Sequence, residues 1–340
     1  MLIHLILLAG GFLLLYFGAE WLVKGSANLA RSLGITPVVI GLTVVAFGTS
    51  APEFVVSVIS SIQDKSMIAV GNVVGSNICN IALVLGAAAA LMPITANRSV
   101  VRRDIPLMLV ISIYLLLLSL DSHISRIEGI TLFTGVILYT IFNYYISLKE
   151  KRSSQAAYFQ PNNNAGGGTP EAGKNFEAKV EEIEIIQSRP RQVVMIIAGI
   201  AGVVIGADTM IDSACVIMKQ FGVGEKFIGL TVVAFGTSLP ELATSVVAAM
   251  KKQMDISIGN LVGSNVFNIL SVIGAAGIVR PIPVPGGFIE SGLIIDYGVM
   301  MGICILPWLM MRKDCTVKRW GGVLLLCCYA GYLAYLIKTG

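Results

Sequence analysis

The sequence predicts an all-α membrane protein in which ten transmembrane helices form two inverted-topology five-helix repeats. Hydrophobic residues make up 55% of the chain and charged residues 13%, a balance typical of membrane proteins and more apolar than a soluble core requires. Apolar runs near the length of a membrane-spanning helix recur along the chain. A polar motif embedded in these runs occurs twice, which indicates an internal repeat.

The expected spans follow the apolar runs, each close to the roughly 20 residues that a helix needs to cross the hydrocarbon core. The runs cover residues 1–20, 35–62, 67–92, 105–120, 127–148, 192–217, 226–250, 256–279, 288–311 and 319–337. The first run lacks a basic n-region and a small-residue cleavage site, so we expect a retained helix rather than a cleaved signal peptide.

A polar segment divides these runs into five and five. Residues 149–191 are rich in Asn, Gly and charged side chains, which is typical of a linker. We therefore expect a first five-helix repeat over residues 1–148, a linker over residues 149–191 and a second five-helix repeat over residues 192–340.

The repeat is visible in the sequence itself. The phrase "GLTVVAFGTSAPE" begins at Gly41 and "GLTVVAFGTSLPE" begins at Gly229, 188 positions later. The same offset links Asn72 to Asn260 and holds over about eighty residues, which indicates a duplication. Because each repeat has an odd number of spans, the second copy must enter the membrane from the opposite side, so the repeats are inverted.

Basic residues predict the orientation of the chain in the membrane. Lysines and arginines crowd the 1–2, 3–4, 7–8 and 9–10 connections and the linker, and few lie on the other side. Because basic residues are concentrated on the cytoplasmic side of membrane proteins, we expect a cytoplasmic linker and both termini outside the cytoplasm.

Each copy of the repeated phrase contains a proline that interrupts its span. Pro52 and Pro240 have no N–H to donate, and they disfavour helical geometry at the residue before them. The carbonyls of residues 46–49 and 234–237 are thereby freed as possible oxygen ligands, provided that they line a polar cavity. The predicted fold has broken helices at spans 2 and 7, and also at spans 3 and 8, which carry the second polar motif.

Polar side chains recur at every fourth position around these breaks, so that each set lies on one face of its helix. The sets are Thr49, Glu53 and Ser57; Thr237, Glu241 and Ser245; Asn72, Ser76 and Asn80; and Asn260, Ser264 and Asn268. Hard oxygen donors of this kind suit Ca²⁺ and Na⁺. Each carboxylate in a membrane costs about 2.5–3.5 kcal/mol, so two at matched positions favour an ion site over ordinary helix pairing.

The doubled "GTS.PE" and "GN.VGSN..NI" motifs resemble the α-repeats of the Ca²⁺/cation antiporter superfamily, specifically the prokaryotic inner-membrane calcium/sodium antiporter group of sodium/calcium exchangers. The resemblance covers the whole ten-span plan. It implies a secondary active antiporter of the cell inner membrane that exchanges Na⁺ for Ca²⁺ by alternating access. The ions are substrates, so we expect no cofactor. The expected partners are Ca²⁺, Na⁺ and the lipid bilayer, with no nucleic acid and no protein partner.

The resemblance also implies the roles of individual residues. Glu53 and Glu241 are the expected Ca²⁺ ligands, and the backbone of Thr49 and Thr237 completes that site. The flanking Na⁺ sites are expected at Ala46, Ser50, Ser76, Ala234, Ser238 and Ser264, with Asn80 and Asn268 lining the middle. Some members, including potassium-dependent exchangers, carry Asp at the position of Asn268, so the Asn here favours exchange without K⁺.

Two other functions remain as alternatives, and a third is not expected. Proton/Ca²⁺ antiport is the nearest, because a glutamate in a dry site can carry H⁺. A cation channel is less favoured, since channels usually complete a pore by oligomer symmetry. An intramembrane enzyme is not expected, because His4 and His123 are the only histidines and both lie far from the motif that contains Ser50.

Overall fold

The computed structural model describes residues 2–63, 66–158, 185–222, 236–284, 287 and 292–339. In these residues the regular structure is helical apart from two short antiparallel strand pairs, β1 with β4 and β2 with β3. The predicted all-α class is therefore confirmed.

The helices fall into three groups. The long helices are α1 (Leu2–Leu33), α8 (Arg126–Tyr158), α10 (Arg189–Gln220), α17 (Leu293–Asp314) and α18 (Arg319–Thr339). The shorter ones are α2 (Pro37–Ile40), α3 (Ala46–Thr49), α4 (Ala51–Ile62), α5 (Ser66–Ile78), α6 (Gly86–Leu91), α7 (Ile105–Ser119), α13 (Leu239–Met250), α14 (Met254–Phe267) and α15 (Gly274–Val279). Wider π-helical segments are η1 (Gly41–Val45), η2 (Cys79–Leu85), η3 (Val100–Asp104) and η5 (Asn268–Ile273). The strands are β1 (Ile94–Thr95), β2 (His123–Ile124), β3 (Ile282–Pro283) and β4 (Thr316–Val317).

The protein is a multi-pass membrane protein. Within the described ranges, seven helices are long and apolar enough to cross a membrane, or eight if the bent pair Pro37–Thr49 and Ala51–Ile62 counts as one span. The expected span at 105–120 corresponds to α7, which has 15 residues, and the expected span at 226–250 runs into residues outside the described ranges. The total of ten spans stays a prediction.

The predicted break in span 2 is confirmed. The chain bends by 47° between α3 and α4, at Ser50. Pro52 lies in the first turn of α4, where a missing N–H leaves no intrahelical hydrogen bond unmade. Pro240 has the same place in α13, which begins at Leu239, although residues 223–235 ahead of it lie outside the described ranges.

The prediction of breaks in spans 3 and 8 is wrong. Helical structure continues from Ile68 to Leu91 and from Met254 to Val279, through the π-helical segments η2 and η5. Neither stretch contains a proline, so no backbone N–H is lost. Instead, each helix widens locally at the second polar motif, as π-helical turns often do at functional sites.

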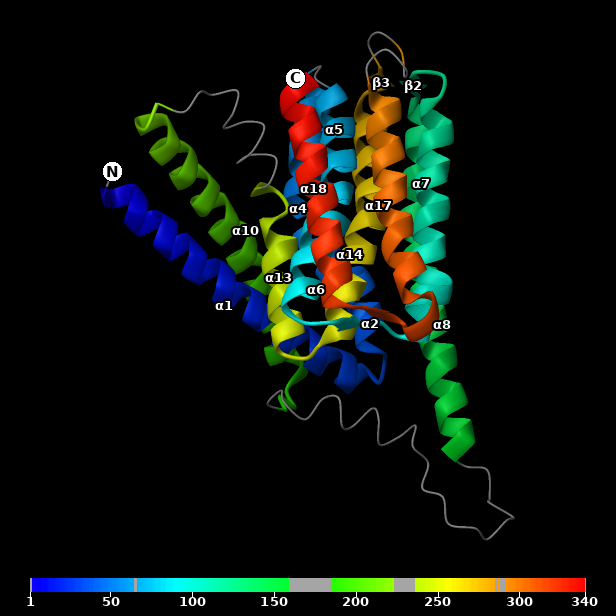
Figure 1. Ribbon diagram of the computed structural model, residues 1–340. Coiled ribbons are helices and arrows are strands. Elements are labelled where there is room, and N and C mark those ends of the chain that lie inside the picture. The colour runs from blue at the N-terminus through cyan, green and yellow to red at the C-terminus, as the bar shows by residue number, and fades with distance from the viewer. Residues whose placement is uncertain are drawn as a thin grey trace.

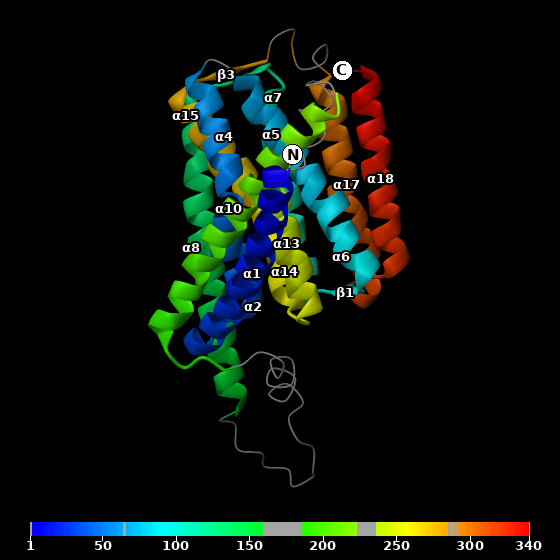
Figure 2. The same ribbon diagram turned by 90° about the vertical axis from the view of Figure 1, so that its left-hand side faces the viewer.

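Helices α1 and α10 form a tilted, antiparallel pair beside the upright bundle (Figures 1 and 2). Glycines let the two backbones approach closely: a Cβ on Gly18 would lie 2.7 Å from the nitrogen of Val203, and one on Gly199 would lie 2.6 Å from the nitrogen of Leu22. Lys251 Nζ, beyond the end of α13, donates a hydrogen bond to Glu20 Oε1 of α1 at 2.7 Å. Leu22 of α1 and Leu239 of α13 belong to one buried apolar cluster, so the pair contacts the bundle through both apolar and polar side chains.

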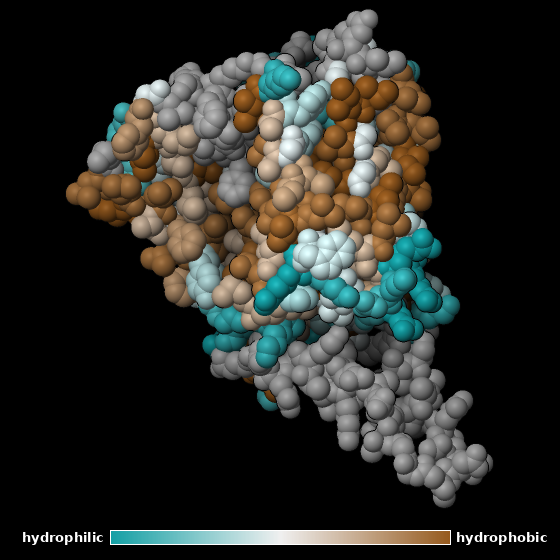
Figure 3. All heavy atoms as spheres, in the orientation of Figure 1, coloured by the Kyte–Doolittle hydropathy of each residue, from teal (hydrophilic) through white to brown (hydrophobic). Residues whose placement is uncertain are grey.

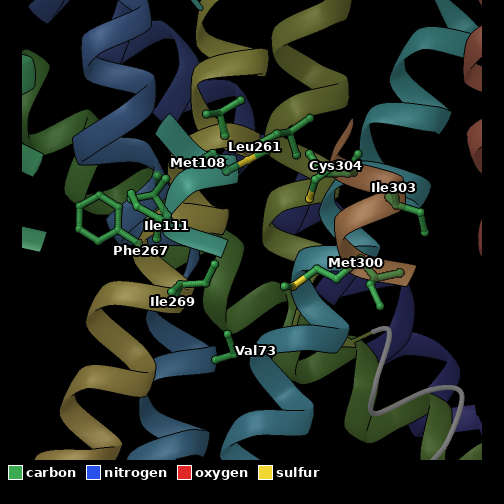
Figure 4. Close-up of a cluster of buried hydrophobic side chains, with 14 of the residues drawn as sticks. Val73, Met108, Ile111, Leu261, Phe267, Ile269, Met300, Ile303 and Cys304 are labelled. Atoms are coloured by element: carbon green, nitrogen blue, oxygen red, sulfur yellow. The ribbon is translucent and has the colours of Figure 1, made fainter. Parts of the chain in front are cut away.

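The bundle surrounds the spans Ile68–Leu91 and Met254–Val279, most of whose residues are buried. Part of its apolar core lies between α5, α7, α14 and α17, where Val73, Met108, Leu261, Met300 and Cys304 are buried (Figure 4). The β1–β4 and β2–β3 pairs lie at opposite ends of the bundle (Figures 1 and 2). Each pair joins a strand of the first half of the chain to a strand of the second.

The two chain ends lie toward the same end of the bundle, and the end of α8 and the start of α10 lie toward the other (Figure 1). Apolar side chains form a band over α17 and α18, and polar side chains gather below it (Figure 3). Outward-facing apolar residues such as Leu309 and Val323 are expected on a lipid-facing surface.

The α1–α10 contact predicts a difference between two glycine substitutions. Gly199→Ala places a methyl group against the backbone of Leu22, so it should destabilise the protein by about 1–3 kcal/mol. Gly10→Ala, on the open face of α1, meets no atom within 4 Å and serves as the control. Thermal unfolding of the purified proteins should show a midpoint several degrees lower for Gly199→Ala alone, and equal midpoints would contradict the close packing.

Candidate functional site

Two carboxylates lie at the centre of the bundle. Glu53 is in the first turn of α4 and Glu241 in the first turn of α13, and both side chains are 0% exposed. The positive end of a helix dipole stabilises a negative charge in the first turn. The starts of α4 and α13 therefore place the N-terminal end of a helix at each carboxylate.

Serine hydroxyls surround the two carboxylates in a matched arrangement. Ser76 Oγ donates to Glu53 Oε1 at 3.5 Å, and Ser264 Oγ donates to Glu241 Oε1 at 3.3 Å. Ser50 Oγ, at the bend between α3 and α4, also donates to Glu241 Oε1, at 3.2 Å. This last contact joins the first half of the chain to the carboxylate of the second.

Thr49 extends the polar region across the same boundary. Its Oγ1 donates to Asn260 Oδ1 at 3.1 Å and lies 3.4 Å from Ser264 Oγ. The carbonyl of Ala46, which the sequence predicts to be freed by the break, accepts the N–H of Ser50 at 3.0 Å. Thr49 Oγ1 also lies 3.4 Å from this carbonyl oxygen, so the break does not leave the carbonyl of Ala46 without protein partners.

Five oxygens of the predicted site residues are buried and have no hydrogen-bond partner in the described part of the chain. They are Glu53 Oε2, Glu241 Oε2, Asn80 Oδ1, Asn268 Oδ1 and Ser238 Oγ. A buried acceptor without a partner is costly, so such atoms usually have a function. Carboxylate and amide oxygens are the ligands that hard cations prefer, so this set fits Ca²⁺ or Na⁺ as a transported ion.

The structure brings most of the predicted site residues into the protein interior. Ala46, Thr49, Ser50, Glu53, Ser76, Asn80, Ser238, Glu241, Ser264 and Asn268 are buried. Thr237 is half-buried, and Ala234 lies outside the described residues. Among the described residues there is no cluster of three or more His, Cys, Asp or Glu side chains.

A second layer of amides supports the site. Asn72 Nδ2 donates to Ser57 Oγ at 3.0 Å, and the matching Asn260 Nδ2 donates to Ser245 Oγ at 3.3 Å. The sequence prediction omitted Asn77 and Asn265, which are buried between α5 and α14. Each is the asparagine that ends one copy of the doubled "GSN" sequence. This position is not part of the four-residue spacing by which the site residues were chosen.

Comparison with known proteins identifies the family. The sequence model described as sodium/calcium exchanger protein matches residues 3–147 and 191–338, which is most of the chain. The chain belongs to the sodium/calcium exchanger family. Matching of both halves agrees with the doubled motif in the sequence.

Several relatives of this exchanger-family chain are similar over nearly its full length. The inner membrane protein YrbG of Escherichia coli is 34% identical, covering 99% of this chain and 97% of that protein. The sodium/calcium exchanger MaX1 of Methanosarcina acetivorans is 30% identical, covering 98% of each. A solved structure of the sodium-calcium exchanger NCX_Mj superposes with a TM-score of 0.79 at 29% identity, covering 98% of each chain. The family consists of transporters rather than enzymes. Because this chain belongs to the family, the comparisons support antiport of cations, with Ca²⁺ among the transported ions.

The two buried carboxylates generate a direct prediction. Glu53→Gln and Glu241→Gln each keep the size of the side chain but remove a charged ligand, so each should abolish Ca²⁺ transport while the protein still inserts into the membrane. Asp121→Asn, at an exposed turn, is the control for exchanging a carboxylate for an amide. The measurement is ⁴⁵Ca²⁺ uptake into proteoliposomes with matched protein content. Normal uptake by either glutamine variant would remove that glutamate from the site.

Proposed function

We propose that this protein exchanges Na⁺ for Ca²⁺ across the inner membrane by alternating access and without K⁺. The observation that carries the proposal is the pair of fully buried carboxylates, each with an oxygen that has no donor in the described part of the chain. Transported cations would be the partners of these oxygens. The relative named sodium/calcium exchanger MaX1 supports Na⁺ and Ca²⁺ as the substrates.

Charge balance explains why these two ions can share one site. Two carboxylates are neutralised by a single Ca²⁺ or by two Na⁺, so either bound state avoids an uncompensated charge in the interior. Binding of one ion species then excludes the other, which is the requirement for exchange. We assign Glu53, Glu241 and the backbone of Thr49 and Thr237 to Ca²⁺. The Na⁺ ligands are Ala46, Ser50, Ser76, Ala234, Ser238 and Ser264, with Asn80 and Asn268 between them.

The proposed architecture is ten spans in two inverted five-helix repeats, joined by a linker over residues 149–191. Reciprocal contacts support it: Asn77 Nδ2 donates to the carbonyl of Asn265, and Asn265 Nδ2 donates to the carbonyl of Asn77. Residues 188 positions apart contact each other in the same way from both sides, as expected for a twofold relation between the repeats.

Alternating access would come from movement of α1 and α10 against the bundle. Two isoleucines of α10 pack directly against glycines of the bundle. A Cβ on Gly48 would lie 2.4 Å from Cδ1 of Ile200, and a Cβ on Gly236 would lie 2.4 Å from Cδ1 of Ile211. These glycines lie immediately before Thr49 and Thr237, shortly ahead of the starts of α4 and α13. Sliding of α10 would therefore uncover one side of the site and cover the other.

The proposed orientation has both termini outside the cytoplasm and the linker inside it. The chain ends lie toward one end of the bundle and the ends of α8 and α10 nearest the linker lie toward the other (Figure 1), which agrees with an odd number of spans in each half. The positive-inside rule then assigns the linker end to the cytoplasm.

Proton/Ca²⁺ antiport is the second candidate, because a buried carboxylate can bind H⁺ in place of Na⁺. The deciding experiment is ⁴⁵Ca²⁺ uptake into proteoliposomes with a Na⁺, K⁺ or H⁺ gradient imposed separately and the voltage clamped. Our proposal predicts uptake with the Na⁺ gradient alone. Uptake driven by a pH gradient without Na⁺ would establish the proton antiporter instead, and dissipative flux without any countergradient would indicate a channel.

Independence from K⁺ gives a further prediction at Asn268. With two carboxylates in the site, no negative charge is left for an additional transported cation, so Ca²⁺ flux at constant Na⁺ should not respond to K⁺. Asn268→Asp adds that charge, and it should introduce sensitivity to K⁺ or H⁺ or slow the exchange by holding ions too tightly. Asn80→Asp places the same charge in the other half for comparison. A wild-type flux that rises steeply with K⁺ would refute the proposal of K⁺-independent exchange.

A further inference from the structure

Four asparagines form a closed hydrogen-bond network between the two central helices. Asn77 and Asn265 each donate Nδ2 to the other's backbone carbonyl, at 3.3 and 3.4 Å. Asn80 Nδ2 donates to Asn265 Oδ1, and Asn268 Nδ2 donates to Asn77 Oδ1, both at 3.1 Å. All four side chains are at most 1% exposed, so water does not compete for these bonds.

The backbone carbonyls fix which way each amide points. A carbonyl oxygen only accepts, so the atom of Asn77 or Asn265 that contacts it must be the NH₂ group. The sulfur of Met300, 3.9 Å from the NH₂ group of Asn77, is also an acceptor, and the thiol of Cys304, 3.9 Å from the NH₂ group of Asn265, can act as one. Both residues belong to α17 (Figure 4). The side-chain oxygens of Asn77 and Asn265 are therefore turned away from the carbonyls.

The orientation of Asn77 and Asn265 determines the orientation of Asn80 and Asn268. Because Asn265 presents an oxygen to Asn80, Asn80 must present its NH₂ group in return, and Asn77 orients Asn268 in the same way. The oxygens of Asn80 and Asn268 are then left without a donor in the described part of the chain. An amide turned the other way would present hydrogens instead, which repel a cation.

We propose that Asn77 and Asn265 are positioning residues, which hold Asn80 and Asn268 with their oxygens toward the transported cation. The inference rests on the proposed cation-exchange function and adds two residues that do not themselves contact the ion. Each acts across the boundary between the halves: Asn265 of α14 orients Asn80 of η2, and Asn77 of α5 orients Asn268 of η5. Each half of the chain thus orients an amide ligand of the other half.

A double-mutant cycle on Ca²⁺ affinity tests this role in the full-length protein. Asn265→Ala should weaken Ca²⁺ binding about fivefold to tenfold, in line with loss of an oriented hydrogen bond. In an Asn80→Ala background the same substitution should weaken binding no further, because its target is gone. The crossed combination, Asn77→Ala with Asn80→Ala, is the matched control and should be close to additive, since Asn77 orients Asn268.

Isothermal titration with Ca²⁺ and thermal unfolding of each variant provide the two readouts. Additive effects for Asn265→Ala with Asn80→Ala would overturn the positioning role, because a general loss of packing does not depend on Asn80. If Asn265→Ala does not fold, the matching pair Asn77→Ala and Asn268→Ala repeats the cycle in the other half, and additive effects there would overturn the proposal. Absence of Ca²⁺ binding by the wild-type protein would instead refute the proposed function.

A separate hollow lies at the turn that joins α17 to α18 through β4. It has a volume of about 530 Å³ and is lined by Arg312, Lys313 and Lys318, with Asp314 as its one lining carboxylate. Asp314 pairs with Lys318 at 3.3 Å. The lining therefore has a net positive charge.

The hollow lies at the turn between α17 and α18, and the surface changes from apolar to polar below the band that these helices carry (Figure 3). Leu309 and Trp320 line it and are 49% and 63% exposed, as expected of side chains at a lipid interface. The guanidinium of Arg312 lies 5.2 Å from the ring centre of Trp308, whose indole N–H donates to the carbonyl of Val101 at 3.0 Å. Arg312 is thus held in place at the edge of the hollow.

We infer that this hollow binds the phosphate headgroup of an anionic phospholipid, with the acyl chains against the apolar band. Basic pockets at the ends of transmembrane helices are suited to such headgroups. The geometry points to a lipid rather than a free anion, because the exposed Leu309 and Trp320 offer contacts that only an acyl chain can use.

Native mass spectrometry of the full-length protein with added phosphatidylglycerol tests the inference. Arg312→Gln with Lys313→Gln should reduce the retained phosphatidylglycerol at least fivefold. Arg126→Gln with Lys338→Gln, at the ends of α8 and α18 away from this turn, removes the same charge and should leave it unchanged. Equal retention in both double variants would overturn the site, and displacement of the lipid by millimolar inorganic phosphate would reassign it to a free anion.

Discussion

Burial of two carboxylates in an apolar interior is the constraint on which the rest of this structure depends. Glu53 and Glu241 are fully buried, and an unpaired charge in such surroundings is far too costly to persist without compensation. The protein supplies part of that compensation through serine hydroxyls and helix N-termini. Under the function proposed above, transported cations supply the remainder of the compensation.

The local irregularities of the backbone follow from this constraint. A break before Pro52 starts a new helix, so that Glu53 lies in its first turn with the dipole directed at the carboxylate. Continuous helices without proline provide the opposite wall, and they widen into π-helical segments where Asn80 and Asn268 enter the site. Regular spans on the outside of the bundle carry the apolar surface that faces lipid.

The sequence predicted the helical class, the family and the break at span 2 because each leaves a local signal: apolar runs, a repeated motif and a proline. It gave the wrong form for spans 3 and 8, since a π-helical segment needs no particular residue. Asn77 and Asn265 were missed because their function depends on contacts between helices far apart in the chain. Side-chain orientation of this kind is a tertiary property, which spacing within one helix cannot reveal.

Equilibrium binding of ⁴⁵Ca²⁺ to the purified protein tests the central claim most directly, with Na⁺ varied at constant ionic strength. If two buried carboxylates form one shared site, the protein should bind a single Ca²⁺, and Na⁺ should displace it with a Hill coefficient above 1, because more than one Na⁺ replaces each Ca²⁺. Ca²⁺ binding that is indifferent to Na⁺, or that survives in the protein with both Glu53→Gln and Glu241→Gln, would contradict the account.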